Sequence, residues 1–220
     1  MKKDSTNHDS PSPQLSASVR IDFPLPIAQA FHSFEKESNW KASLTQLCEL
    51  AGICIQTISL FLFSQYLCNT ENNIENNTRM ENLLRKELSK PVSYGTWLGL
   101  SLRFVREIKG RKTQGIKKLI DSFGEDGKQD NMGTLYGLFS KIVVLRNQLL
   151  KKSAGMAPQK KERDELLRLL VSAFNQLRFL DEWYIVGTQT SRTDGNIRRH
   201  DVRIFAGSDM SGRPDYMSCG

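Results

Sequence analysis

The chain has 220 residues and a mass of 25.0 kDa, enough for one well-buried domain with a small appendage, which excludes two large domains. Hydrophobic residues make up 39% and charged residues 25%, the balance of a soluble globular protein. The formal net charge of +7 and the pI of 9.3 favour phosphate backbones or anionic surfaces as partners, while an ordinary solvated basic surface is an equal alternative.

The cysteines indicate a reducing compartment. Cys48, Cys54 and Cys68 fall within one apolar stretch, and Cys219 is next to the C-terminus. None belongs to a Cys-x-x-Cys pair or has a histidine nearby, so we expect small buried hydrophobic residues, with no metal site and no cofactor. Residues 1–20 contain no apolar segment of the kind that a secretory signal needs. The expected location is the cytoplasm.

The N-terminal part of the chain predicts a tail followed by a short helix. Residues 1–20 are rich in Ser, Asp, Asn and Pro, which predicts a disordered tail. Pro26 suits a first helical turn, because its missing N–H group would have no partner there. Ile27, Phe31 and Phe34 then recur at helical spacing, so a short first helix is expected.

The next expected element, Trp40–Cys68, is the most hydrophobic of the chain. It is apolar on nearly all sides, which is typical either of the centre of a helical bundle or of a membrane span. Polar residues such as Glu49, Gln56 and Ser64 interrupt it, and such residues are expensive in hydrocarbon. We therefore expect a buried helix and no membrane partner.

The middle of the chain predicts connectors and shorter helices. Residues 69–78 are rich in Asn and Glu and predict a loop, followed by a short helix over 80–88. Ser93 is the expected N-cap of the next helix, whose apolar stripe includes Phe104 and Ile108. A helical turn at 116–123 then precedes a Gly-rich acidic loop that lacks the ligand spacing of an EF-hand and the Gly-Lys-Ser/Thr of a P-loop.

The most informative segment is the helix expected over residues 135–150. Arg146 follows Ile142 by four residues and Phe139 by seven, so it lies along the edge of the apolar stripe at about 100° per residue. A guanidinium at the border of a core needs an anionic or hydrogen-bonding partner, because leaving it desolvated and unpaired costs on the order of several kcal/mol.

The C-terminal part predicts one more long helix and a β-hairpin. The helix covers about residues 160–180, and alternating, β-branched residues then flank Asp194 and Gly195, a hairpin turn signal. The expected fold is all-α, an antiparallel helical bundle of about five to six helices with a small C-terminal hairpin. The expected division is a tail at 1–20, the bundle at 21–182, the hairpin at 183–206 and a flexible tail at 207–220.

Residues 143–151, with the sequence VVLRNQLLK, resemble the signature of the HEPN family of helical bundles. Ribonucleases of that family carry an Arg, a polar residue and, a few positions on, a His. Arg146 and Asn147 match the first two, whereas Lys151 stands where the His is expected. The resemblance also covers the PLPI start of the first helix, the long apolar second helix and the leucine-rich helix after Arg146, over about residues 23–183.

The resemblance implies a homodimer whose paired Arg and His residues form a shared cleft. RNA is then cut without metal by attack of its own 2′-hydroxyl on the adjacent phosphate, with His moving protons and Arg stabilising the charge on the phosphoryl oxygens. Lys151 is a poor replacement, because a lysine with a pKa near 10.4 keeps its proton at neutral pH. His8, His32 and His200 lie elsewhere in the sequence.

We therefore expect a catalytically degenerate HEPN-like module that dimerises, binds RNA phosphates or does both, within a bacterial defence, toxin–antitoxin or signalling system. The residues expected to bind nucleic acid are Arg146, Lys151, Lys152, Lys160 and Lys161.

Three alternatives stay open at this stage. One is an active metal-independent endoribonuclease that borrows a histidine, for example His32 of a partner protomer. Another is a scaffold without nucleic-acid binding that contacts a partner protein through the second helix or the hairpin. The last is purely structural: Arg146 lies on the core and pairs with a local carboxylate, while Lys151 and Lys152 face the negative end of the helix dipole.

Overall fold

The computed structural model describes most of the chain. Side chains are not described for the strands and for some helix-end residues, including Lys151 and Lys152. The described backbone covers residues 11–68, 74–89, 91–108, 117–123, 134–152, 160–182, 185–194, 197–205 and 213–219.

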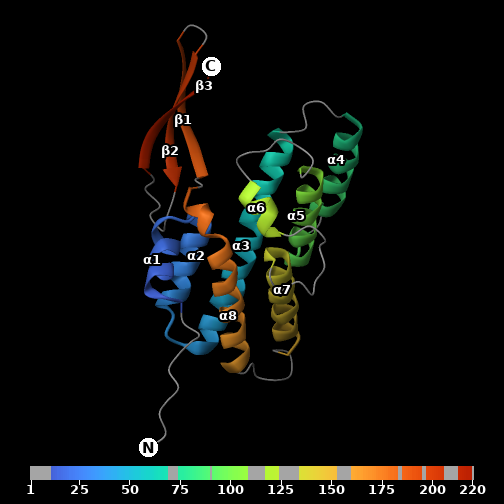
Figure 1. Ribbon diagram of the computed structural model, residues 1–220, viewed down its shortest axis with the longest axis vertical. Coiled ribbons are helices and arrows are strands. Elements are labelled where there is room, and N and C mark those ends of the chain that lie inside the picture. Colours follow the sequence, from blue (N-terminus) through green and yellow to red (C-terminus); the bar gives the residue numbers. More distant parts are fainter. Residues whose placement is uncertain are drawn as a thin grey trace, which may run out of the picture.

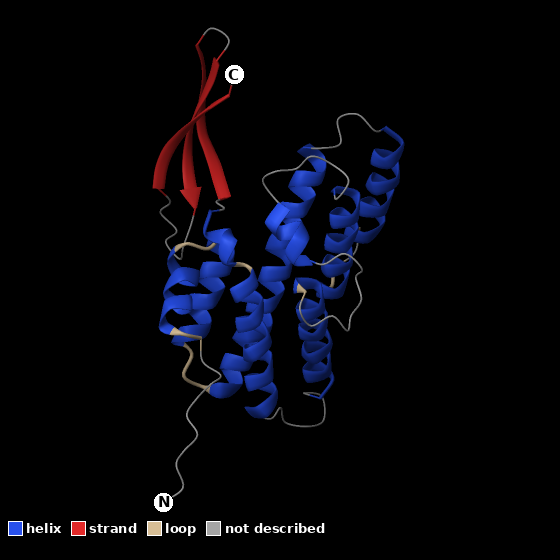
Figure 2. Ribbon diagram, in the orientation of Figure 1, coloured by secondary structure: helices blue, strands red, loops and turns tan. Residues whose placement is uncertain are grey.

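The described chain forms a bundle of α-helices followed by strands (Figures 1 and 2). The first four helices are α1 (Pro13–Ile21), α2 (Leu25–Lys36), α3 (Trp40–Cys68) and α4 (Ile74–Leu88). The next four are α5 (Tyr94–Ile108), α6 (Lys117–Phe123), α7 (Leu135–Lys152) and α8 (Lys160–Gln176), and α8 is followed by the 3-10 helix η1 (Arg178–Glu182). The prediction of a helical bundle is confirmed, although the described helices number eight where five to six were expected.

Helix α3 is the centre of the bundle, as its composition predicts. It contacts α2, α5, α7 and α8, and Figure 1 shows α1 and α2 on one side of it with α5 and α7 on the other. Leu47, Leu50, Ile55, Ile58 and Leu62 are at most 1% exposed. Among the described helices, α3 is the one long and apolar enough to cross a membrane, but more than half of that stretch is buried inside the protein.

Helix α1 corrects the expectation of a disordered tail over residues 11–20. Ser12 is its N-cap, since its Oγ accepts a hydrogen bond from the Leu15 N–H at 3.2 Å. Leu15 and Val19, four residues apart, are buried, and Arg20 forms an ion pair of 3.3 Å with Glu35 of α2. Two apolar residues on one face were enough to bury this helix, although the surrounding composition is polar. Residues 1–10 lie outside the described part.

The remaining differences from the predicted helices are local. Helix α4 begins at Ile74, inside the stretch whose composition predicts a loop, while α5 begins after Ser93 as expected. The Ser93 Oγ accepts a hydrogen bond from the Thr96 N–H at 3.1 Å, which confirms the predicted N-cap. The last long helix ends at Gln176, four residues earlier than expected, because the chain continues as η1.

Helices α3 and α5 are joined by a buried polar contact. The Ser59 Oγ donates to the Ile55 carbonyl oxygen of its own helix at 2.7 Å, and it lies 2.5 Å from the Ser101 Oγ, which donates to the Trp97 carbonyl oxygen at 3.0 Å. Further along, Phe63 packs on Phe104 with ring centroids 5.5 Å apart. The residue numbers of these contacts rise together on both helices, so α3 and α5 run in the same direction. This parallel pair is an exception to the predicted antiparallel arrangement. It is possible because α4 lies between α3 and α5 in the sequence.

The backbone after the bundle is traced as three strands, β1 (Ile185–Asp194), β2 (Ile197–Phe205) and β3 (Arg213–Cys219). They pair antiparallel in the order β1-β2-β3, with an irregularity between Thr188 and Thr190. The strand β3 lies within residues 207–220, where the composition predicts a flexible tail. The side chains of all three strands lie outside the described part, so the role of the hairpin as an appendage stays a prediction.

Candidate functional site

Arg146 lies near the C-terminal end of α7, half-buried at the edge of the apolar stripe as its spacing predicts. Its guanidinium carbon stands 4.4 Å from the centroid of the Tyr94 ring of α5. Its Nη1 donates a hydrogen bond of 3.3 Å to the Oδ1 of Asn147. Arg146 therefore belongs to a contact between α7 and α5 and does not extend freely into solvent.

Within the described part of the chain, no carboxylate forms an ion pair with Arg146. Its Nε is buried and has no hydrogen-bond partner there. An unsatisfied buried donor costs on the order of 1–3 kcal/mol, and a cation over an aromatic ring recovers about 0.5–2 kcal/mol. The structural alternative, in which Arg146 pairs with a local carboxylate, thus has no support among the described residues.

Tyr94 owes its position to two local features. It is the first residue of α5, and the Ser93 cap sets where that helix begins. Its ring lies directly against the backbone of Gly52 on α3, where a Cβ atom would overlap the ring Cζ and the hydroxyl oxygen. Sequence reasoning missed Tyr94, because nothing in the local sequence indicates a contact across 42 to 52 residues. The signal that could have drawn attention to it is the single glycine in the middle of the apolar helix α3.

The cysteines near this site are not reactive groups. Burial raises the pKa of the Cys48 thiol; the positive charge of Arg146 opposes this shift and Glu49 adds to it. Burial also raises the pKa of Cys54, which is fully buried. Both thiols therefore keep their protons at neutral pH, and a protonated thiol is a poor nucleophile. The prediction of a small buried hydrophobic residue is confirmed for Cys54, while Cys48 is half-buried.

The lysines expected to bind nucleic acid fall into two groups. Lys151 and Lys152 are the last residues of α7, but the described part of the chain does not include their side chains. Lys160 and Lys161 begin α8 and line a groove of about 470 Å³. The other residues that line this groove are Asp164, Glu165 and Arg168. Arg146 does not line this groove, so the described side chains do not group Arg146 with Lys160 and Lys161.

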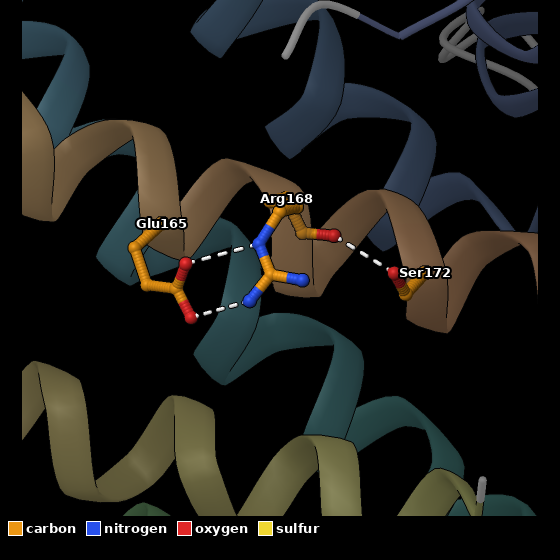
Figure 3. A network of polar contacts seen from close by, with 3 residues as sticks. All are labelled: Glu165, Arg168 and Ser172. Carbon is orange, nitrogen blue, oxygen red and sulfur yellow. Dashed lines mark hydrogen bonds and ion pairs between the residues drawn. The ribbon is translucent and has the colours of Figure 1, made fainter. Parts of the chain in front are cut away.

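Carboxylates compensate much of the positive charge in this α8 groove. Glu165 accepts two hydrogen bonds from Arg168, at 3.0 Å from Nε and 2.6 Å from Nη2, and Ser172 donates to the Arg168 carbonyl oxygen (Figure 3). Asp164 pairs with Arg163 at 2.9 Å. In the groove, Lys160 and Lys161 therefore lie beside ion pairs whose charges cancel. The groove attracts phosphate less strongly than the two lysines would by themselves.

The Glu165 carboxyl carries a testable pH dependence. The hydrogen bond from Arg168 lowers its pKa below the ordinary value of 4.5, and the charges of Arg168, Lys141 and Lys161 act in the same direction. The stabilisation from the pair is complete above the pKa of the unfolded state and is lost as the pH falls through the lower folded pKa. The side chains of Glu165 and Arg168 are both roughly half exposed. We therefore expect their ion pair to contribute less than about 1 kcal/mol to the free energy of unfolding.

We expect an NMR titration of the Glu165 carboxyl carbon to show a midpoint below 4.5 in the wild-type protein. Arg168→Ala should move this midpoint back toward 4.5, since it removes the largest cause of the shift. Arg178→Ala, at an exposed arginine beyond α8, serves as the control and should leave it unchanged. A wild-type midpoint at or above 4.5 would contradict the ion pair.

A second groove, of about 240 Å³, lies between α7 and α8. Its lining comprises Ser140, Lys141, Val144, Leu145, Gln148, Glu165 and Leu169. Val144 is 51% exposed there.

The exposure of α3 bears on the scaffold alternative. Among the described large hydrophobic side chains of α3, only Leu60 is exposed to a similar extent, at 53%. Within the described part of α3, Leu60 is therefore the one large hydrophobic side chain that is mainly exposed.

The histidines do not supply a proton shuttle beside Arg146 in the described structure. His32 lies on α2, a helix that packs mainly on α1 and α3. His8 and the side chain of His200 lie outside the described residues. Among the side chains that the structure describes, no three His, Cys, Asp or Glu residues gather as metal ligands would.

Comparison of the chain with models of protein families, with curated proteins and with solved structures found no match.

Proposed function

We propose that this protein is a catalytically degenerate HEPN-like module that binds the phosphate backbone of RNA through Arg146. The observation that carries the proposal is a guanidinium with no described carboxylate partner, held against the Tyr94 ring beside Asn147. A planar guanidinium of this kind suits the oxygens of a phosphate, to which it can donate parallel hydrogen bonds.

The net charge of +7 supports the same ligand class. A positive field attracts a polyanion at long range, while a specific arginine fixes one phosphate at short range. We place Arg146 at the centre of the site, with Lys151 and Lys152 at the end of the same helix as further phosphate contacts. Lys160 and Lys161, which line the separate α8 groove, would contact another part of the same RNA backbone. Asn147, which already contacts the guanidinium, would share in binding the phosphate.

The proposal includes binding without cleavage. General acid and base catalysis of RNA cleavage needs a group that exchanges a proton near neutral pH, and Lys151 occupies the position of the family histidine. Homodimer formation and a place in a bacterial defence, toxin–antitoxin or signalling system are parts of the proposal that rest on the family resemblance. A cytoplasmic location is a further part, which rests on the cysteines and on the polar composition of residues 1–20. The hairpin of residues 183–206 is proposed as an appendage that a partner protein contacts.

The test is fluorescence anisotropy with a labelled single-stranded RNA of mixed sequence and the wild-type chain, followed by electrophoresis of the RNA in EDTA. We expect binding that weakens by about tenfold between about 50 and 200 mM salt, because a few phosphate contacts release counterions. The RNA should remain intact. Absence of salt-sensitive binding would overturn the proposed function, and cleavage that Arg146→Ala abolishes would establish the ribonuclease alternative in its place.

A further inference from the structure

Tyr94 connects the proposed site to the centre of the bundle. One part of its side chain lies against the Gly52 backbone of α3, and the ring face lies 4.4 Å from the guanidinium carbon of Arg146 on α7. Gly52 is buried, and any side chain there would overlap the phenol ring. The close approach of α3 and α5 at this level therefore depends on a glycine.

The ring is constrained from the side of its own helix as well. The Ser93 cap sets the first turn of α5, and a Cβ on Gly95 in that turn would come within 3.8 Å of Val143 Cγ1 on α7. Tyr94 thus belongs to a turn that contacts both α3 and α7. A ring held in this way has little freedom to move away from Arg146.

We infer that Tyr94 is a positioning residue for the proposed anion site, and that Gly52 provides the space that Tyr94 needs to hold Arg146. This inference rests on the proposed function. Arginine is a long, flexible side chain, and a ligand that must first order it loses affinity. The contact with the Tyr94 ring would restrict the guanidinium before the ligand arrives. Apart from the contact with Asn147, its terminal amino groups make no hydrogen bond to a described residue, which would leave them able to donate to the ligand.

The contact itself is tested in the free protein. The ring current of Tyr94 should shift the Nε–Hε signal of Arg146 in an NMR spectrum away from its ordinary position. Tyr94→Leu should remove this shift, and Tyr94→Phe should retain it, because phenylalanine keeps the aromatic face. An unshifted wild-type signal would overturn the inference whatever the RNA measurements show.

The role in binding is tested with the labelled RNA. Tyr94→Leu should weaken binding by about fivefold, the size of a partly exposed cation–π contact, and Tyr94→Phe should bind as the wild type does. Wild-type binding by Tyr94→Phe would show that the aromatic face of residue 94 supports binding and that its hydroxyl group is not needed. If Tyr94→Leu binds as tightly as the wild type while Arg146→Ala binds weakly, the inference fails and the proposed function stands. If Arg146→Ala binds as tightly as the wild type, both fail.

A pair of substitutions separates positioning from stability. Gly52→Ala should displace the ring and weaken RNA binding as much as Tyr94→Leu does, with a lower melting temperature. The double variant Gly52→Ala/Tyr94→Ala has no ring for the added methyl group to overlap. Its melting temperature should therefore be higher than that of Gly52→Ala alone. RNA binding should stay weak in the double variant. Recovery of binding together with stability would overturn the inference, because it would show that only the packing matters.

Discussion

Phe174→Ala is expected to lower the free energy of unfolding by about 3–5 kcal/mol. Phe174 of α8 is 1% exposed. Its ring packs edge-on against Phe23, in the connection between α1 and α2, at 5.9 Å and against Phe31 of α2 at 5.7 Å, so it joins the last long helix to α2 and to the connection before it. Removal of the ring leaves a cavity between elements that cannot close without moving α8, and the absence of two edge-to-face ring pairs adds to the cost.

Urea denaturation followed by circular dichroism measures this effect. The matched control is Leu60→Ala, which also shortens a large side chain but at a position that is 53% exposed, and it should change the free energy of unfolding by less than about 0.5 kcal/mol. A loss below about 1 kcal/mol for Phe174→Ala would mean that α8 does not pack on α2 in this way.

Arg146→Glu is expected to weaken binding of single-stranded RNA by about a hundredfold at low salt. Removal of the charged hydrogen bonds to phosphate accounts for about tenfold, and a carboxylate beside the same phosphate adds repulsion of similar size. The folded state should tolerate the change, because Arg146 is half-buried and has no described carboxylate partner to leave behind.

Arg103→Glu is the matched control for this charge reversal. Arg103 is an exposed arginine of α5, so its replacement alters the net charge by the same amount without touching the proposed site. We expect it to weaken RNA binding by no more than about threefold, through the long-range field alone. Equal losses for both variants would show that RNA responds to net charge and not to Arg146.

Most helices could be predicted from the sequence, because an apolar stripe or, in α3, a continuous apolar run marks each one. Ile27, Phe31 and Phe34 predicted α2, and the run of apolar residues predicted α3 as the central helix. Helix α1 was missed because only Leu15 and Val19 mark its buried face, and their burial depends on α2 and α8. A short helix in a polar segment is stabilised by tertiary packing, which composition does not show.

The candidate site could be predicted only in part. The border position of Arg146 follows from helical geometry and is what the structure shows. Its contact with Tyr94 depends on where α5 begins and on how closely α3 approaches at Gly52, which are properties of the assembled bundle. Lys160 and Lys161 were grouped with Arg146 by charge alone, whereas they line a separate groove with acidic neighbours.

The most direct test of phosphate binding by Arg146 is the salt dependence of RNA affinity in the wild type and in Arg146→Ala. A plot of the logarithm of the association constant against the logarithm of the salt concentration gives a slope proportional to the number of phosphates neutralised. We expect the slope of Arg146→Ala to be shallower by about 0.7, the value for one fewer neutralised phosphate on a single strand, while Arg103→Ala keeps the wild-type slope. Identical slopes for the wild type and Arg146→Ala would show that Arg146 does not contact the RNA backbone.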